Sequence, residues 1–390
     1  MKIDLLFPSL PPQIDGIGDY TAHIAREMSK TADVRVLTGN NTRYDEIDGV
    51  EITPAFTLRR RSSILDCVAP ICARKPDWLI LQYNPFSYGK WGLNPYVPKL
   101  VSRVKRQSPT TRVAVMVHEM FLVFAFERWQ TTIMTTWQRL QFWQLGRQAD
   151  IMFFSSMSYI DLVSSWFPST PLRHLPVGCN IDAVDLTAAE ARRQLGIADD
   201  EFVLGFFGGT RIFRNVEQVI AAATALAATG VKTVLLMIGD GSAEPVKPVP
   251  GLRVVAAAKL PASEVSLRFR AMHVYLAPYA DGASTRRGTF VAGLAHGLPI
   301  VSTIGTNSDK LISDQNGRSC LLVDATDAVA FTNAVLRLAA QPDQRAQLAK
   351  SCESFFSNQF TWQKICDAMF EALKSVSGHP TSAQRTRTSV

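Results

Sequence analysis

Small residues and two arginines stand directly before a predicted helix in the second half of the chain. Ser284, Arg286 and Arg287 lie in this loop, and the run 294–303 (LAHGLPIVST) has the form of a helix end, a glycine turn and a buried strand. The first-turn N–H groups of a helix are free, and the helix dipole adds positive potential there. The segment predicts a pocket for a phosphate or diphosphate. The alternative is an ordinary loop–helix–strand unit with solvated arginines.

A second polar group follows the apolar run Val113–Val117, where His118 and Glu119 stand side by side. A titratable pair at the carboxyl end of a buried parallel strand points to the edge of the sheet where ligands bind. Glu119 would orient the imidazole or cap the following helix. The alternative is a histidine with a purely structural role.

The run GGTRIFR follows the predicted strand Phe202–Phe207 at the equivalent position of the second half. Gly208 and Gly209 would let a ligand approach the backbone closely. Arg211 and Arg214 would stabilise a leaving diphosphate, which becomes more negative as a glycosidic bond breaks. Surface arginines on an ordinary loop are the alternative.

A first glycine pair, Gly16 and Gly18, precedes a predicted helix that begins near Asp19. The spacing is that of the start of a dinucleotide fingerprint, but Thr21 stands where the third glycine would be, so an NAD site is not favoured. The pair would instead give backbone room for a diphosphate or acceptor group, or form a plain turn.

Short apolar runs alternate with helical segments in both halves, which predicts an α/β fold with parallel sheets covered by helices. The predicted strands are 3–7, 34–38, 78–82, 112–117, 151–155, 172–176, 202–207, 234–238, 252–256, 274–277 and 299–302. We expect two Rossmann-like, doubly wound domains facing across a cleft that holds the site. The first spans 1–182 and the second 183–360. A helix over 361–376 returns to the first domain, and the tail 377–390 is disordered.

Composition is that of a globular protein, with 47% hydrophobic residues among 390 and a net charge of +7. No nucleic-acid-binding signature accompanies the basic charge, so nucleic acid is not expected as a partner. No apolar run is long enough to span a bilayer. The six cysteines are scattered, which favours buried thiols in a reducing compartment. We expect a cytoplasmic protein.

The segment 121–147 is dense in aromatic and basic residues. Aromatic residues at this spacing are typical of core packing. A hydrophobic acceptor or an anionic membrane surface would also suit them, because aromatic and basic side chains sit together at lipid headgroups. An anionic membrane surface, at the inner face, is therefore a candidate partner.

In combination, these motifs resemble the retaining GT-B glycosyltransferases of family 4 over nearly the whole chain. The matching features, in order, are Gly16 and Gly18, His118, LPVGCNID at Leu175–Asp182, GFFGG at Gly205–Gly209, LAHGLPIVST at 294–303 and FTWQKICDAMFEAL at Phe360–Leu373. The resemblance implies that the second domain holds a nucleotide-diphosphate sugar. The first domain would hold a glycan or lipid-linked acceptor.

The resemblance also assigns roles to residues. His118 matches the family's histidine near the reacting sugar, and Arg214 falls where the family has a lysine on the diphosphate, with Arg211 in support. Backbone N–H groups of Gly288, Thr289 and Phe290 would hold phosphate oxygens. The resemblance implies no metal ion and no cofactor, and no DxD triplet occurs in the chain.

One departure concerns two glutamates that the family carries with seven residues between them. Ser284 and Ala292 stand at these positions, and Asp281 is the nearest acidic residue. We interpret the chain as a variant subgroup that transfers a sugar with retention of configuration. The alternatives are a non-catalytic nucleotide-sugar-binding or partner-binding module and, less favoured because acidic residues are scarce, an epimerase of nucleotide sugars.

Overall fold

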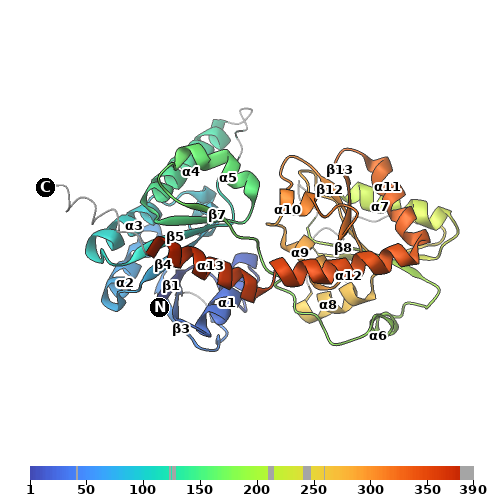
Figure 1. Ribbon diagram of the computed structural model, residues 1–390, viewed down its shortest axis with the longest axis horizontal. Helices are drawn as coiled ribbons and strands as arrows, with labels where there is room; N and C mark the ends of the chain where they lie inside the picture. Colours follow the sequence, from blue (N-terminus) through green and yellow to red (C-terminus); the bar gives the residue numbers. More distant parts are fainter. Residues whose placement is uncertain are drawn as a thin grey trace. The chain divides into compact units, whose positions relative to one another are not determined.

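The protein folds into two compact units, described here from a computed structural model (Figure 1). The structure describes residues 1–40, 43–122, 124, 129–209, 215–239, 247–258 and 260–377. Unit 1 comprises Met1–Pro176 with Trp362–Val390, and unit 2 comprises Val177–Thr361. The boundary between the units thus precedes Asp182, the last residue of the first domain that we predicted.

Unit 1 is built on a seven-stranded parallel sheet with the order β3-β2-β1-β4-β5-β6-β7. The strands are β1 (Lys2–Leu6), β2 (Asp33–Gly39), β3 (Val50–Phe56), β4 (Trp78–Tyr83), β5 (Arg112–Val117), β6 (Ile151–Phe154) and β7 (Leu172–His174). The helices are α1 (Gly16–Ser29), α2 (Val68–Arg74), α3 (Tyr96–Gln107), α4 (Trp129–Gln148), α5 (Met157–Val163) and α13 (Trp362–Ser377). Short 3₁₀ turns occupy Arg61–Cys67, Pro85–Ser87, Lys90–Gly92 and Ser164–Trp166.

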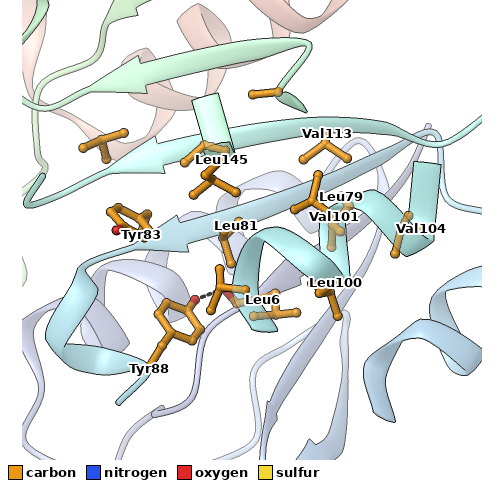
Figure 2. Close-up of a cluster of buried hydrophobic side chains, with 14 of the residues drawn as sticks. Leu6, Leu79, Leu81, Tyr83, Tyr88, Leu100, Val101, Val104, Val113 and Leu145 are labelled. Atoms are coloured by element: carbon orange, nitrogen blue, oxygen red, sulfur yellow. Dashed lines mark hydrogen bonds between the residues drawn. The ribbon is translucent and has the colours of Figure 1, made fainter. Parts of the chain in front are cut away.

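One face of this sheet packs against α2, α3 and α4 through a continuous apolar core. Figure 2 shows Leu81 of β4 and Val113 of β5 facing Val101 of α3 and Leu145 of α4. The Tyr88 hydroxyl donates to the carbonyl oxygen of Leu6 at 3.0 Å, so the loop after β4 is tied to the end of β1. Consecutive residues of the central strands are buried, which places apolar contacts on both faces, as expected for a parallel sheet.

The C-terminal helix α13 belongs to unit 1 and packs beside α1. The Arg112 guanidinium donates to the carbonyl oxygens of Val376 and Ser377, which satisfies acceptors left free at the end of the helix. At the other end Trp362 stacks on His23 with ring centroids 4.9 Å apart. Side-chain contacts at both ends therefore fix α13 on unit 1.

Unit 2 is built on a six-stranded parallel sheet with the order β10-β9-β8-β11-β12-β13. The strands are β8 (Phe202–Phe207), β9 (Thr233–Ile238), β10 (Leu252–Ala257), β11 (Val274–Ala277), β12 (Ile300–Ile304) and β13 (Cys320–Asp324). The helices are α6 (Ala188–Gln194), α7 (Val216–Ala228), α8 (Ala262–Ala271), α9 (Gly288–Ala295), α10 (Lys310–Ser313), α11 (Ala328–Ala340) and α12 (Pro342–Gln359). One apolar cluster joins the sheet to α7 and α11, and another joins it to α8, α9 and α12.

The predicted class, two doubly wound α/β sheets, is confirmed. Two strands escaped prediction, β3 and β13, and both lie at sheet edges. Pro54 lies within β3 and argues against a strand, but an edge strand tolerates proline because one side makes no ladder hydrogen bonds. The prediction that the first helix begins near Asp19 is wrong. Helix α1 begins at Gly16, and the Asp15 side chain caps it.

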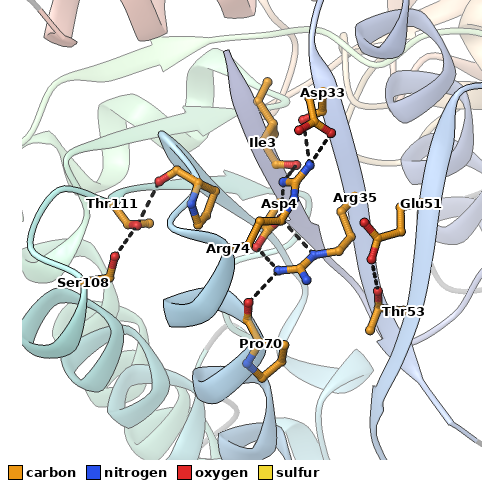
Figure 3. Close-up of polar contacts among 11 residues, drawn as sticks. Ile3, Asp4, Asp33, Arg35, Glu51, Thr53, Pro70, Arg74, Ser108 and Thr111 are labelled. Carbon is orange, nitrogen blue, oxygen red and sulfur yellow. Dashed lines mark hydrogen bonds and ion pairs between the residues drawn. The ribbon is translucent and has the colours of Figure 1, made fainter.

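A buried carboxylate links three segments of unit 1 (Figure 3). Asp4 of β1 is fully buried, and Arg35 of β2 holds it through two bonds, of 3.1 Å from Nε and 2.6 Å from Nη2. Arg74 of α2 adds a bond of 2.7 Å, and Arg35 also donates to the carbonyl oxygen of Pro70 at 3.0 Å. Burial raises the pKa of Asp4, and the two guanidiniums act in the opposite direction.

We expect Asp4→Asn to lower the free energy of unfolding by about 3 kcal/mol, because it leaves two guanidiniums facing a neutral amide in the interior. Asp66→Asn is the matched control, since Asp66 pairs with Arg60 at the surface, where its side chain is 54% exposed. That change should cost less than about 1 kcal/mol. Urea denaturation of both variants measures the difference, and equal small losses would contradict the structural importance of the network.

Two histidines of unit 2, the buried His296 and the partly buried His273, make the fold sensitive to acid. The Nδ1 atom of His273 accepts the N–H of Val203 at 2.9 Å, and Nε2 of His296 lies 2.8 Å from the Ser266 hydroxyl, while Nδ1 donates to the Ala292 carbonyl. Burial lowers the pKa of both imidazoles to about 4. Protonation would remove the acceptor nitrogen that each neutral ring presents.

Because the folded-state pKa lies below the unfolded value, this contribution is complete above about pH 6.5 and is lost as the pH falls toward 4. At pH 5 the loss amounts to about 2 kcal/mol per histidine. We expect His296→Gln to reduce the difference in unfolding free energy between pH 7.5 and pH 5, measured in urea. An unchanged difference would show that His296 does not contribute to the acid sensitivity.

Candidate functional site

The strand order in the sheet of unit 2 reverses at β8. Strand β9 lies on one side of β8 and β11 on the other. In doubly wound sheets, ligands bind outside the carboxyl ends of the strands at such a switch point. The loops that meet here follow Phe207, Ile238, Ala277 and Ile304, the last residues of β8, β9, β11 and β12. This edge of unit 2 is therefore the candidate site of the second unit.

Glycines allow two of these loops to touch through their backbones. Gly208 and Gly239 both have positive φ, +130° and +116°. A Cβ atom on Gly239 would lie 2.7 Å from the carbonyl oxygen of Gly208, so no larger residue fits without displacement of the backbone. Gly209 comes next and is half-buried. The two arginines predicted beyond it, Arg211 and Arg214, lie outside the described residues.

Asp281 is the centre of a polar cluster in the loop between β11 and α9. Its carboxylate accepts from Arg286 at 3.2 Å, from Arg287 and from the Asn307 amide at 3.0 Å. Its backbone carbonyl also accepts the N–H of Asn307 at 2.8 Å, which joins this loop to the one after β12. The structure thus brings the predicted residues Asp281, Arg286 and Arg287 together.

A second carboxylate, that of Asp309, binds the same loop. Asp309, 1% exposed, accepts the backbone N–H of Thr285 at 2.5 Å and the Thr285 hydroxyl at 2.6 Å. Ser284 is fully buried, and its hydroxyl has no hydrogen-bond partner among the described residues. Ala292 is also buried. Both positions at which the family carries glutamates are therefore turned into the protein.

The N-terminus of α9 leaves one backbone donor open. No side chain caps this end, and the N–H of Gly288 donates to no acceptor among the described residues. A Cβ atom at Gly288 would meet nothing within 4 Å, so there is room for a ligand. The N–H of Phe290 donates instead to the Arg287 carbonyl at 2.8 Å. Of the predicted phosphate donors, Phe290 is therefore already engaged, whereas the N–H of Gly288 stands open.

Aromatic hydroxyls position the first turn of α9. The Tyr279 hydroxyl lies 2.7 Å from the Thr289 hydroxyl, and the Tyr275 hydroxyl donates to the Thr289 carbonyl at 3.0 Å. The Arg287 guanidinium lies over the Tyr279 ring, 5.0 Å from its centroid. Thr289, predicted to bind the donor, thus also anchors the helix to β11.

In unit 1, His118 lies directly after β5 and is almost fully buried, with 9% of its surface exposed. Its Nε2 atom is 2.8 Å from the amide oxygen of Gln82, and the Tyr20 ring contacts its edge with centroids 4.8 Å apart. Burial lowers the pKa of His118 to about 3, so the imidazole is neutral at pH 7. Because Nε2 donates to Gln82, Nδ1 keeps a lone pair that can accept a hydrogen bond from a hydroxyl group.

Glu119 does not orient the imidazole of His118. Its carboxylate instead accepts a hydrogen bond from the Tyr159 hydroxyl at 2.7 Å. The residue that orients His118 is Gln82, which the sequence analysis missed. A glutamine inside the apolar run Trp78–Tyr83 was the available signal, because a buried amide needs a partner.

The first glycine pair divides between two roles. A Cβ atom on Gly18 would lie 2.9 Å from the Ser9 carbonyl, whereas Gly16 faces open space. The Asp15 carboxylate already accepts from the N–H groups of Ile17 and Gly18, at 2.9 Å and 3.1 Å. This end of α1 is therefore occupied by an acidic cap and is less suited to a diphosphate than α9 is.

Asp19, in the first turn of α1, is a further candidate that the sequence analysis missed. Burial and the charge of Asp15 raise its pKa to about 6. A carboxyl group that titrates near neutrality is suited to accept a proton from a hydroxyl, as general bases do.

No group of three or more histidine, cysteine or acidic side chains placed to hold a metal ion occurs among the described residues.

Comparison with known proteins now adds to this geometry. Residues 201–341, which include the α9 loop, match the family model described as "Glycosyl transferases group 1". The chain is 23% identical to the GDP-mannose-dependent alpha-(1-6)-phosphatidylinositol monomannoside mannosyltransferase of Mycolicibacterium smegmatis, over 92% of this chain and 94% of that protein.

Solved structures share the fold across almost the entire chain. Sucrose-phosphate synthase from Thermosynechococcus elongatus has a TM-score of 0.69 at 16% identity, covering 96% of this chain and 99% of its own. HepE of Anabaena, in complex with UDP and glucose, has a TM-score of 0.66 at 14% identity, covering 96% of this chain and 100% of its own. At these identities the likeness establishes the architecture.

No helix in the described ranges combines the length and the hydrophobicity that a membrane-spanning helix requires. The family match over residues 201–341 and the curated relative support a glycosyltransferase over the non-catalytic alternative. The solved structures share its architecture of two Rossmann-like sheets, that of the GT-B type.

Proposed function

We propose that the protein transfers a sugar from a nucleoside-diphosphate sugar to a glycan or lipid-linked acceptor, with retention of anomeric configuration and without a metal ion. The observation that carries the proposal is the open N-terminus of α9 at the switch point of unit 2. Gly288 offers a free N–H group and empty space there, with Arg286 and Arg287 beside it.

The diphosphate would bind at this helix end and be stabilised as it leaves. Negative charge builds on the diphosphate while the glycosidic bond breaks, and N–H groups and guanidiniums fixed in advance stabilise that charge. The carboxylate of Asp281 binds both Arg286 and Arg287, which holds two guanidiniums beside this helix end. By the family resemblance, Arg211 and Arg214 would add to it.

Retention is implied by the family resemblance, and the carboxylates of this loop bear on the route by which it would occur. Asp281 is held by two arginines and Asn307, and Asp309 is buried against Thr285. Neither is placed as a free nucleophile, which makes a covalent glycosyl intermediate on these side chains unfavourable. We infer that the acceptor attacks the sugar from the face that the diphosphate leaves. Ser284 would contribute through the shape of the loop rather than through its buried hydroxyl.

His118 would contribute a neutral hydrogen-bonding nitrogen rather than a positive charge. Its pKa of about 3 keeps the imidazole unprotonated, and Gln82 fixes the ring so that Nδ1 is the atom left to meet a hydroxyl. A neutral acceptor suits a sugar or acceptor hydroxyl that must be oriented before transfer.

Two donor bases deserve testing first. The mycobacterial relative is GDP-mannose-dependent and its named acceptor is a phosphatidylinositol mannoside, while HepE binds UDP and glucose. A lipid-linked acceptor is our preferred class for this chain, because the relative aligns over nearly its full length.

A thermal-shift panel of GDP, UDP and their sugar conjugates tests the proposal directly. A ligand that binds only the folded state at 100 times its Kd stabilises the protein by about 2.7 kcal/mol, which raises the melting temperature. We expect one base to give a selective rise. The Gly288→Glu variant should bind that nucleotide at least tenfold more weakly, because the new carboxylate faces the phosphates.

Gly288→Glu should fold normally, since its Cβ enters open space and an acidic residue suits the first turn of a helix. Ala328→Glu is the matched control: it places the same charge at the exposed first position of α11 and should leave nucleotide binding unchanged. Equal affinity of all three proteins would remove the α9 end from the site.

His118→Gln should lower the transfer rate at least tenfold while nucleotide affinity and melting temperature stay near those of the parent protein. Glutamine places its amide near the Nε2 position, where it can still donate to Gln82, but it removes the acceptor atom at the Nδ1 position. Product analysis by NMR of the anomeric proton reports configuration in the same reaction. A sharp fall in melting temperature with normal turnover per folded molecule would assign His118 a structural role, and an inverted product would refute retention.

A further inference from the structure

Helix α4 of unit 1 exposes an apolar face in addition to the one that it buries. Phe142 and Leu145 pack in the core beside the polar residues Thr135 and Gln138, whereas Trp129 is 68% exposed, Trp137 54% and Ile133 49%. A helix on the surface of a globular protein normally directs its apolar stripe to the core and polar residues outward. The second apolar face of α4 therefore lacks contacts that would bury it within unit 1.

The exposed apolar residues form one continuous stripe. Trp129, Ile133, Trp137 and Leu140 follow one another at intervals of four and three residues, so they lie on one side of the helix. Trp143 is one further step along the same side and is also exposed. We call these five residues the α4 stripe.

Polar groups on the buried face explain how the stripe is kept outward. The amide of Gln138 accepts from the N–H of Leu122 at 3.0 Å and donates to the carbonyl oxygen of Trp91 at 2.8 Å. Gln141 accepts from the N–H of Asn94 at 2.8 Å. If α4 rotated to bury its tryptophans, these backbone groups would lose their partners inside the protein, at about 1–3 kcal/mol each.

The same bonds bring another exposed tryptophan close to α4. Trp91, whose backbone Gln138 holds, has 63% of its surface exposed and a left-handed backbone with φ of +61°. Such a conformation costs a bulky residue about 1–2 kcal/mol, so it is kept by the surrounding contacts. Lys90 lies over its ring, 5.4 Å from the centroid, and Arg147 lies 5.0 Å from that of Trp143.

The segment of the sequence that contains the stripe is mostly positive in charge. From Asn84 to Gln148 the sequence contains nine lysines and arginines against two glutamates, and α4 itself has no acidic residue. A symmetric dimer through the stripe would place this patch against its own copy, with basic groups facing basic groups. The charge therefore disfavours a second copy of the chain and favours an anionic surface.

We propose that the α4 stripe, together with Trp91, docks on the interface of a bilayer that contains anionic lipids. Tryptophan rings prefer the boundary between headgroups and acyl chains, and basic side chains beside them reach the phosphates. An interfacial helix of this kind lies in the membrane plane and does not cross it. This docking goes beyond the proposed sugar transfer and does not depend on it.

Docking would serve a lipid-linked acceptor. Helix α4 follows β5, and the carboxyl end of β5 carries His118, so docking would hold the membrane near the edge of unit 1 where His118 lies. The acceptor headgroup could then reach that edge while its acyl chains stay in the bilayer.

Vesicle flotation of the full chain tests the docking. We expect the protein to float with vesicles of phosphatidylcholine and phosphatidylglycerol at low salt, and to partition at least tenfold less into phosphatidylcholine alone. The triple variant Trp129→Ser, Ile133→Ser, Trp137→Ser should lose binding to the anionic vesicles at least tenfold. Val329→Ser is the control, because Val329 is 70% exposed on α11 of unit 2, and it should float like the parent.

Intrinsic fluorescence supplies an independent readout, since tryptophans that enter the interface shift their emission to shorter wavelength on addition of vesicles. Nucleotide binding by the triple variant, measured by thermal shift, should equal that of the parent, which separates this test from that of the transferase proposal. Absence of flotation at low salt, or equal flotation of the triple variant, would overturn the docking. A parent dimer that the triple variant converts to monomer would instead assign the stripe to a contact between copies.

Discussion

The carboxylate of Asp281 is the interaction on which the candidate donor site depends. It binds Arg286 and Arg287 from its own loop and Asn307 from the loop after β12, so one side chain sets the positions of two loops. Gly282 and Gly305 allow these loops to approach backbone to backbone beside it. The start of α9 follows directly, which means that the open Gly288 donor is placed by contacts made before the helix begins.

Unit 1 relies in the same way on buried amides. Gln82 orients His118, Gln138 ties Trp91 and Leu122 to α4, and Gln141 binds Asn94. Each amide pairs with a group on a different segment, which holds the described residues His118, Trp91, Asn94 and Leu122 in place. A buried amide that lost its partner would carry a desolvation cost of about 1–3 kcal/mol, which makes alternative arrangements unfavourable.

Much of the architecture was predictable because central parallel strands are continuous apolar runs. Runs such as Phe202–Phe207 can bury both faces only inside a sheet. The edge strand β3 was not predictable from its composition, since Pro54 is tolerated only because the edge leaves one side unpaired. The residues around α9 were found from a loop signal, whereas Asn307 acts through a contact between distant segments, which no local pattern encodes. For Gln82 the sequence offered only a polar residue within a buried run, and its partner His118 lies on another segment.

The absence of the two family glutamates changes the charge of the donor site rather than simply weakening it. The carboxylates near α9, Asp281 and Asp309, are bonded to arginines or to Thr285, and Ser284 and Ala292 are buried. What this loop offers a ligand is a helix N-terminus and guanidinium charge, which favour the diphosphate. Recognition of the sugar hydroxyls would then depend on other groups. A site that binds mainly the diphosphate would tolerate a different sugar more readily than a donor without the negative charge of the diphosphate.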